Sequence, residues 1–344
     1  MNTYLKEDFE NISEYIKDFN IKNSTFLITG ATGFIGSYIV RFLDFFNQNY
    51  SANINILAMA RDEEKVKKIY EKSSQNVKFL YADLTCDFNL PKGIDYIIHT
   101  ASPTNSKYML NFPIETTNAI ILGTQKILEY AKNNKIKGVV YLSSMEVFGK
   151  FDSCEKLLEE NHLGYVDLQN PRNCYPLAKR LAENMCKSYS VEYNVNVKIA
   201  RLAQVFGAGV LPWENRVFSQ FSKSVLKGED IVLHTTGETI GNYCYISDTV
   251  KGIFLILNKG NSGECYTVVN EKNSTSIKDM AKMVADNFSN GKSKVVFDIP
   301  SNNLYGYAET TKIRLSSKKL NNLGWKAEIS LEESYRRMLP FIKE

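Results

Sequence analysis

Residues 25–36 read TFLITGATGFIG, a short apolar, β-branched run that leads directly into glycines at positions 30, 33 and 36. The apolar residues of the following stretch, 35–46, recur with helical spacing. Glycines at these positions permit a tight turn, close approach of the backbone to a pyrophosphate, and close packing of the helix on the strand. The N–H groups at the start of the helix attract an anion. This stretch therefore predicts a strand–turn–helix unit that binds a dinucleotide.

The same alternation of strand and helix patterns continues to about residue 205. Apolar runs predict strands at 25–29, 54–60, 77–81, 96–100, 138–143 and 197–200. Helical periods predict helices at 35–46, 63–71, 114–133 and 175–193. Alternation of this kind predicts an α/β fold, a Rossmann-type doubly wound parallel sheet covered by helices on both faces.

The chain is expected to divide into three regions. Residues 1–24 form an N-terminal helical extension, because Leu5, Phe9, Ile12, Ile16 and Phe19 follow one another at steps of four and three. Residues 25–205 form the dinucleotide-binding domain, on which 241–260 pack. The rhythm breaks after residue 205, so 206–240 and 261–344 are expected to form a smaller, partly interleaved substrate-binding lobe.

Composition narrows the classes of function. Hydrophobic residues make up 44% of the 344 residues and charged residues 23%, which is ordinary for a globular protein. The net charge of +4, from 42 basic and 38 acidic residues, predicts no nucleic-acid or membrane surface. The six cysteines form no CxxC pair and have no histidine at zinc spacing, so no metal site is predicted. Scattered thiols, an acidic N-terminus and the lack of an apolar run of about 18 residues predict a cytoplasmic protein.

A second group of reactive residues begins at the end of the strand expected at 138–143. The chain reads SSMEVFG over 143–149, and YPLAK over 175–179 opens a helix. Tyr175 and Lys179, four residues apart, lie on one helix face. A neighbouring ammonium lowers a phenol pKa from about 10 toward that of a working base, and the Ser144 hydroxyl can hold the substrate oxygen. The pattern predicts a Ser144–Tyr175–Lys179 catalytic centre; the alternative is a structural cation–aromatic pair.

Together these motifs resemble the short-chain dehydrogenase/reductase superfamily, and more closely its extended branch, the NAD-dependent epimerases and dehydratases of nucleotide sugars. The likeness covers nearly the whole chain after residue 24. It implies a nucleotide-sugar substrate and a homodimer, because helices 114–133 and 175–193 resemble those of that family's intersubunit four-helix bundle. The cofactor-binding residues that it implies are Gly30, Thr32, Gly33, Phe34, Ile35, Gly36, Arg61, Asp83, Leu84, Thr100, Ala101, Ser102, Asn118, Ser143, Tyr175 and Lys179. The substrate-binding residues are Ser144, Met145, Glu146, Gln204 and Arg216; an alternative for Arg216 is a surface charge.

The end of the second strand bears on the choice of cofactor. Ala60 stands where enzymes that prefer NAD carry an acid, and Arg61 follows it. An arginine here could bind a 2′-phosphate, so the sequence favours NADP over NAD. Alternatively, Arg61 pairs with Asp62 or Glu64, or stacks on adenine. Asp83 matches the residue that contacts the adenine amino group, or it caps a turn.

The family's chemistry implies that Tyr175 takes a proton from a sugar hydroxyl, typically at C4, while hydride leaves that carbon for the nicotinamide. The ketone then acidifies neighbouring C–H bonds. Glu146 matches the glutamate of the dehydratases and the sugar-acid decarboxylases, which the 4-epimerases lack. It would remove the C5 proton, or it is an exposed loop residue. Met145 replaces their acid, and Gly241 replaces the arginine of the decarboxylases.

Several reactions therefore stay open. The first hypothesis is a 4,6-dehydratase or epimerase. The alternative is an NADP-dependent keto-sugar reductase or dehydrogenase. A UDP-sugar-acid decarboxylase and a non-enzymatic dinucleotide-sensing regulator rank below them.

Overall fold

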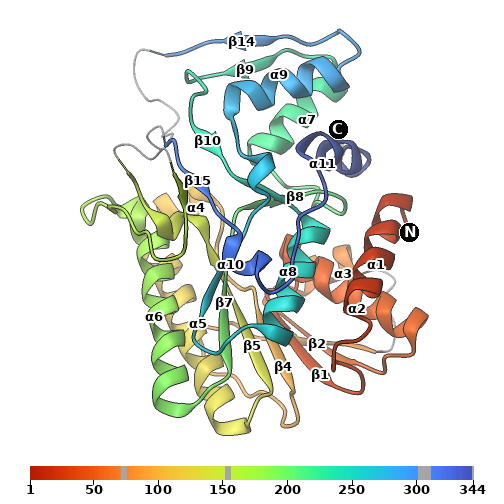
Figure 1. Cartoon of the computed structure of the whole chain (residues 1–344), viewed down its shortest axis with the longest axis vertical. Helices are drawn as coiled ribbons and strands as arrows, with labels where there is room; N and C mark the ends of the chain where they lie inside the picture. Colours follow the sequence, from red (N-terminus) through yellow and green to blue (C-terminus); the bar gives the residue numbers. More distant parts are fainter. Residues whose placement is uncertain (71–75, 152–155, 301–310, 343–344) are drawn as a thin grey trace.

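A seven-stranded parallel sheet forms the centre of the protein in the computed structural model, which describes residues 1–70, 76–151, 156–300 and 311–342. Its strand order is β12-β7-β5-β4-β1-β2-β3 (Figure 1). The strands are β1 (Thr25–Thr29), β2 (Asn55–Ala60), β3 (Val77–Tyr81), β4 (Tyr96–His99), β5 (Gly138–Ser144), β7 (Val197–Leu202) and β12 (Cys265–Val268). The order reverses between β1 and β4, and ligands of such sheets bind at the carboxyl ends of the strands beside this point. The predicted fold class is confirmed.

Helices cover both faces of the sheet, because the inner strands are apolar on both sides. Phe26 and Ile28 of β1 pack with α1 (Thr3–Ile16), α2 (Phe34–Tyr50) and α8 (Ile246–Lys259). Leu27, between them, points to the opposite face and packs with α5 (Pro113–Asn134) and α6 (Cys174–Tyr193). Figure 1 shows these two helical layers on either side of the sheet. The short helices α3 (Glu63–Ile69) and α4 (Ser106–Asn111) lie in the connections that follow β2 and β4.

The predicted helices are present with shifted ends. The N-terminal helix ends at Ile16 rather than 19, and Phe19 packs against the core from beyond it. Helix α2 extends to Tyr50 instead of ending at 46. The last residue of the helix expected at 63–71 lies outside the described residues, as does Cys154.

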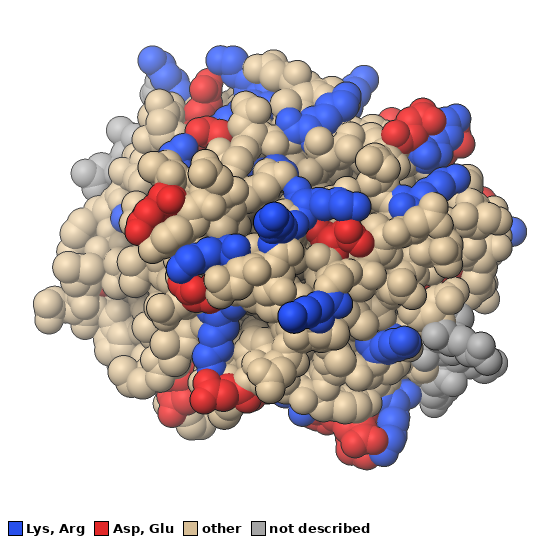
Figure 2. Space-filling view, turned by 90° about the horizontal axis from the view of Figure 1, so that it is seen from below, with Lys and Arg blue, Asp and Glu red and all other residues tan. Residues whose placement is uncertain are grey.

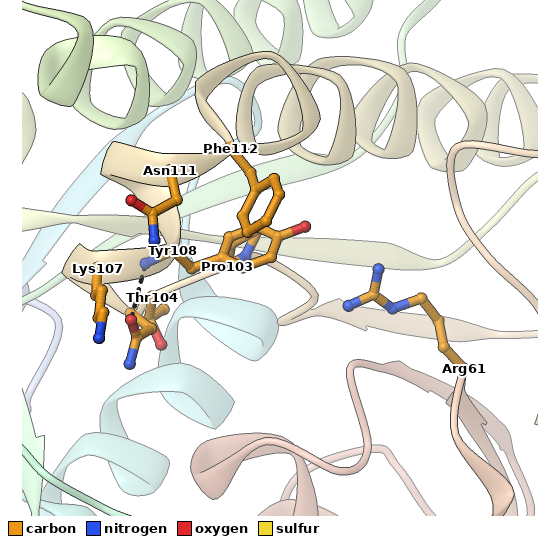
Figure 3. Close-up of a pocket in the computed structure, with 8 residues that line it drawn as sticks. Arg61, Pro103, Thr104, Lys107, Tyr108, Asn111 and Phe112 are labelled. Carbon is orange, nitrogen blue, oxygen red and sulfur yellow. Dashed lines mark hydrogen bonds between the residues drawn. The ribbon is translucent and has the colours of Figure 1, made fainter.

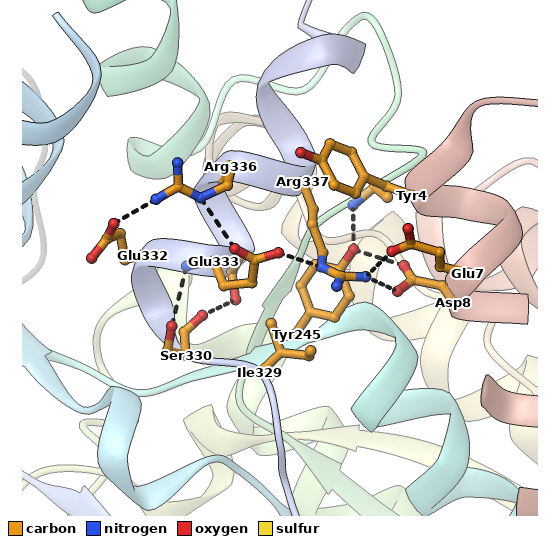
Figure 4. Close-up of polar contacts among 12 residues, drawn as sticks. Tyr4, Glu7, Asp8, Tyr245, Ile329, Ser330, Glu332, Glu333, Arg336 and Arg337 are labelled. Carbon is orange, nitrogen blue, oxygen red and sulfur yellow. Dashed lines mark hydrogen bonds and ion pairs between the residues drawn. The ribbon is translucent and has the colours of Figure 1, made fainter.

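Asp8 joins the N-terminal helix to distant parts of the chain (Figure 4). Its Oδ2 accepts hydrogen bonds from the hydroxyls of Tyr38 (3.2 Å) and Tyr245 (2.7 Å), and its Oδ1 lies 3.0 Å from Nη1 of Arg337. Tyr38 belongs to α2, whereas Arg337 belongs to α11 (Leu331–Met338) near the C-terminus. The extension is thus built into the core rather than attached to its surface.

The remaining elements lie at the carboxyl edge of the sheet, above it in Figure 1. Short strands pair there in twos: β8 (Gln204–Phe206) with β11 (Tyr243–Tyr245), β9 (Ile231–Leu233) with β14 (Val295–Phe297), β10 (Ile240–Gly241) with β13 (Thr275–Ser276), and β6 (Leu157–Leu158) with β15 (Arg314–Leu315). The helices are α7 (Val217–Lys227), α9 (Ile277–Phe288), α10 (Lys318–Asn321) and α11.

One strand departs from the sequence-based division into regions. Residues 261–344 were assigned to the substrate lobe, but β12 pairs with β7 and forms an edge of the central sheet. Strand β12 is only four residues long. A run this short does not indicate which strand it pairs with, so the pairing could not be predicted from local sequence.

Charges on the surface are mixed. In the face shown in Figure 2, acidic side chains lie beside many of the basic ones. Among the described residues, no helix combines the length and the apolar character needed to cross a membrane.

Candidate active site

The glycine turn lies at the carboxyl end of β1, where the strand order reverses. Gly30 has a φ of 67°, and a Cβ on it would lie 2.8 Å from the Cα of Ala101. A Cβ on Gly36 would lie 2.3 Å from the carbonyl oxygen of Gly30. Both positions therefore require glycine. Gly33, the N-cap of α2, is exposed and has no side chain to bond the first N–H groups of the helix, which leaves them available to an anion.

The exit of β4 is fastened to this turn by Thr29. The Thr29 hydroxyl accepts hydrogen bonds from the backbone N–H groups of Thr100 (3.1 Å) and Ala101 (3.2 Å), and it lies 2.7 Å from Nδ1 of His99. Burial, with a smaller effect of the Lys179 charge, lowers the pKa of His99 to about 3. His99 is therefore a neutral structural partner of the loop that continues into Ser102.

Arg61 lies at the other end of the expected dinucleotide site. Its Nη1 is 3.5 Å from Oδ2 of Asp83, and its side chain is 65% exposed. Pairing with Asp62 or Glu64 was one alternative for Arg61; its partner is instead Asp83. Partial burial opposes ionisation of Asp83, but hydrogen bonds from Thr85 and the charge of Arg61 lower its pKa.

A cavity of about 400 Å³ opens beside Arg61 (Figure 3). Across it from the guanidinium lie Tyr108 and Phe112, whose ring centroids are 5.0 Å apart, and Lys107 also lines it.

Two other residues expected to bind the cofactor differ in exposure. Asn118 is exposed on α5, whereas Leu84 is buried beneath Gly123.

Tyr175 and Lys179 are buried on one face of α6, directly beneath the end of β5. The Lys179 Nζ donates a hydrogen bond to the carbonyl oxygen of Leu142 (2.7 Å) and lies 5.8 Å from the centroid of the Tyr175 ring. Burial lowers the pKa of Lys179 to about 7. Burial thus disfavours its ammonium form.

The expected lowering of the Tyr175 pKa is not observed. Burial, and then the charge of Glu146, raise the pKa of this phenol; the Ser144 hydrogen bond and two arginines, Arg172 and Arg216, oppose the rise. The loss of hydration destabilises the phenolate by more than these partners stabilise it, so the pKa of Tyr175 rises. Lysine spacing alone was therefore an insufficient guide to the acidity of this tyrosine.

Glu146 is joined to an arginine that the sequence analysis did not identify. Ser144 ends β5, and its Oγ accepts a hydrogen bond from the backbone N–H of Glu146 (3.2 Å). The two oxygens of the Glu146 carboxylate accept hydrogen bonds from the two terminal nitrogens of Arg172, at 3.0 and 3.1 Å. Arg172 stands three residues before Tyr175, and this proximity was the only signal in the sequence that could have drawn attention to it.

Arg216 lies near enough to the same centre for its charge to act toward lowering the pKa of Tyr175. Its guanidinium binds the Glu214 carboxylate at 3.0 and 2.6 Å and lies over the Phe218 ring. Gln204 begins β8 and is partly exposed. Met145 is partly buried and packs against an apolar cluster that includes Val147 and Leu158.

Gly241 occupies a position where a side chain has no room. A Cβ there would lie 2.3 Å from the hydroxyl oxygen and 2.5 Å from two ring carbons of Tyr243, a fully buried residue. An arginine at position 241 would require this ring to move.

The residues present fit a dinucleotide. The N–H groups that follow Gly33 have no capping side chain and can bind a pyrophosphate. The cavity beside Arg61 lies at the end of β2, the strand next to β1. The Ser143 Oγ, at the end of β5, is buried and has no hydrogen-bond partner among the described residues. A buried hydroxyl without a partner is costly, so a ligand group beside it would be stabilising.

The family model described as "NAD dependent epimerase/dehydratase family" matches residues 26–270. The chain is 25% identical over 332 residues to a dTDP-D-glucose 4,6-dehydratase of Bos taurus, covering 92% of this chain and 88% of that protein. It is 27% identical over 319 residues to a putative UDP-glucose 4-epimerase of Methanocaldococcus jannaschii, covering 92% and 98%. The structure resembles that of a UDP-glucuronic acid 4-epimerase from Bacillus cereus in complex with UDP-glucuronic acid and NAD, with a TM-score of 0.75, 20% identity, and coverage of 92% and 98%. That likeness shows a shared fold.

Proposed function

The chain belongs to the NAD-dependent epimerase/dehydratase family, enzymes of the extended short-chain dehydrogenase/reductase type, and from this premise we propose that it acts as a nucleotide-sugar 4,6-dehydratase. The observation that carries the proposal is the Glu146 carboxylate. Glu146 lies two residues after Ser144, whose hydroxyl accepts a hydrogen bond from the Glu146 N–H, and its charge raises the pKa of the Tyr175 phenol. A carboxylate at this place supplies the base that elimination needs after C4 is oxidised.

A bound nicotinamide dinucleotide would accept hydride from the sugar and return it. The glycine turn from Gly30 to Gly36 would hold its pyrophosphate, and Ser143 would face the group at the end of β5. Asp83, Leu84 and Asn118, with the loop Thr100–Ala101–Ser102, complete the proposed cofactor contacts.

A preference for NADP is proposed from Arg61. Its exposed guanidinium at the cavity rim supports contact with a 2′-phosphate. The Asp83 carboxylate 3.5 Å away acts in the opposite sense, because it partly neutralises Arg61 and would repel a phosphate.

The proposed oxidation uses buried groups of α6 and β5. The Tyr175 hydroxyl would take the proton from the sugar C4 hydroxyl while Ser144 holds that oxygen. Lys179, beneath the ring, would favour the tyrosinate whenever its amine is protonated. Arg216 and Gln204 would contact the nucleotide diphosphate and the sugar from the lobe, and Met145 would line the sugar site.

Decarboxylation fits the site less well than elimination. A sugar carboxylate would need a cation of its own, yet Gly241 has no room for a side chain and Arg172 is engaged by Glu146. A 4-epimerase is the second candidate. Met145 favours it, since this apolar side chain cannot protonate the hydroxyl that leaves C6 in a dehydratase.

Glu146→Gln separates the two reactions. The wild-type protein and the variant are incubated in deuterated water with dTDP-glucose, UDP-glucose and UDP-N-acetylglucosamine, and products are identified by mass and NMR. We expect the wild type to form a product lighter by one water and labelled at C5. The variant should still reduce cofactor transiently, because Tyr175 and Lys179 remain, but it should release no such product. A product of unchanged mass, without label and with inverted C4, would establish the epimerase.

A further inference from the structure

We propose that Arg172 is the positioning residue of this enzyme's base: it holds the Glu146 carboxylate in the orientation that removes the sugar C5 proton. The inference rests on the proposed elimination and deepens it, because it names the group that controls the second step. In that step the C5–H bond breaks, the proton passes to a Glu146 oxygen, and the bonding electron pair moves into the C4 ketone to form an enolate.

The contact between the two side chains fixes an orientation as well as a distance. Nη1 of Arg172 lies 3.0 Å from one carboxylate oxygen, and Nη2 lies 3.1 Å from the other. Two parallel bonds from a planar fork hold both the plane and the rotation of a carboxylate, which a single bond or a point charge does not. The Glu146 side chain is 36% exposed and would otherwise be free to turn toward water.

The backbone on both sides of the pair is fixed as well. Glu146 lies in the 3₁₀ turn Met145–Phe148, and its N–H is bound by the Ser144 hydroxyl. Arg172 lies in the 3₁₀ turn Pro171–Asn173, and its N–H is bound by the Asn170 side chain at 3.0 Å. The second turn leads directly into α6, which carries Tyr175. The ion pair therefore connects the turn that follows Ser144 with the turn that precedes the tyrosine helix.

Charge gives the pair a second effect on the site. The Glu146 carboxylate raises the pKa of Tyr175, while the Arg172 guanidinium lowers it. Because they act in opposite senses, the pair can place a base beside the tyrosine at a smaller electrostatic cost than a lone carboxylate would impose. Arg172 thus has contacts with the base and an influence on the phenol, although it need not touch the substrate.

The test compares Arg172→Gln, Arg172→Lys and Glu146→Gln. Arg336→Gln is the matched control, since it breaks two other arginine–glutamate pairs on the distant helix α11, with Glu332 (2.6 Å) and Glu333 (3.2 Å). Each protein receives whichever of dTDP-glucose and UDP-glucose the wild type oxidises, in deuterated water. Transient cofactor reduction reports the first step, and deuterium exchange at C5 reports the second.

We expect Arg172→Gln to keep the substrate KM and to slow cofactor reduction by less than about 10-fold, through the phenol, while C5 exchange falls on the order of 100-fold. Arg172→Lys should recover only part of the lost C5 exchange, because lysine restores the positive charge but cannot form the two parallel hydrogen bonds of a guanidinium group. Guanidinium ion at sub-denaturing concentration should raise the exchange rate of Arg172→Gln, and Arg336→Gln should behave as wild type.

Three results would overturn the inference. One is exchange in Arg172→Gln within about 3-fold of wild type, given that a base correctly placed contributes far more than this. Another is equal loss of cofactor reduction and exchange in both Arg172 variants, which indicates a structural role. The third is full recovery in Arg172→Lys, which would assign the effect to charge alone. Wild-type exchange in Glu146→Gln, or oxidation of the sugar by the wild type without any exchange at C5, would instead reject the proposed elimination.

Discussion

At the scale of single residues, the chemistry depends on one buried phenol. Tyr175 is 5% exposed, and a phenylalanine at this position would keep the ring and remove only the hydroxyl. Tyr175→Phe should therefore lower turnover by about 10²–10⁴-fold, because a positioned proton relay contributes that much. Folding and dinucleotide affinity should stay close to wild type, as measured by thermal unfolding and fluorescence titration. More than a few per cent of residual activity would exclude Tyr175 as the base.

Arg61 offers a second test with a single side chain. Its ion pair with Asp83 is exposed, so its removal should change stability by less than about 1 kcal/mol. If Arg61 binds a 2′-phosphate, Arg61→Ala should weaken NADP by about 1.5–3 kcal/mol, roughly 10- to 150-fold, and barely alter NAD. Calorimetric titration with both dinucleotides measures this. Equal losses, or tighter binding of NAD than NADP by the wild type, would refute the NADP preference.

At the scale of elements, the N-terminal helix carries a buried acid whose ionisation is costly. Burial raises the pKa of Asp8 from 3.8 to about 6, against the lowering effects of Tyr245, Arg337 and Tyr38. Glu7 also faces Arg337, at 3.4 Å. Since the folded state holds this proton more tightly than the unfolded chain, Asp8 favours folding fully below pH 4. This contribution disappears as pH rises through about 6.

Asp8→Asn should therefore flatten the pH dependence of stability in that window. Between about pH 4 and 7, the contribution of Asp8 to the free energy of unfolding should fall by about 3 kcal/mol in the wild type and stay constant in the variant. Urea unfolding at several pH values measures the slope, whatever offset the substitution causes. The exposed Asp18 provides the control as Asp18→Asn, and an unchanged slope in Asp8→Asn would contradict the assignment.

At the scale of the whole molecule, the exposed surface of α5 and α6 indicates that two copies of the chain associate. These two helices pack on each other, and large apolar side chains remain exposed on them: Ile114, Leu122, Leu181, Val191 and Tyr193. Exposed apolar residues grouped on paired helices commonly mark an interface. We propose a homodimer formed through this surface.

Light scattering at micromolar concentration should give twice the 39.2 kDa mass of the chain. Leu181→Glu should shift the protein toward monomer, because the charge would be buried at the interface without a partner. Val232→Glu, on the exposed face of β9, is the matched control and should leave the mass unchanged. A monomeric wild type would contradict the proposal.

Local patterns in the sequence were sufficient for the framework. The strands β1 and β3 have the predicted ends, because apolar runs and turn residues act over a few neighbouring positions. The glycine turn and the shared face of Tyr175 and Lys179 follow from spacing within one strand–turn–helix unit or one helix. In both cases the interacting groups are close along the chain, and the backbone geometry alone brings them together.

Only the tertiary structure decided the features that depend on distant contacts or on burial. Arg172 meets Glu146 across 26 residues, and Asp8 meets Tyr245 across 237. Local periodicity says nothing about such pairs, since their separation along the chain is bridged by the packing of whole elements. The same holds for β12, which needs β7 as its partner, and for the raised pKa of Tyr175. That rise depends on how deeply the phenol is buried, which local sequence does not show.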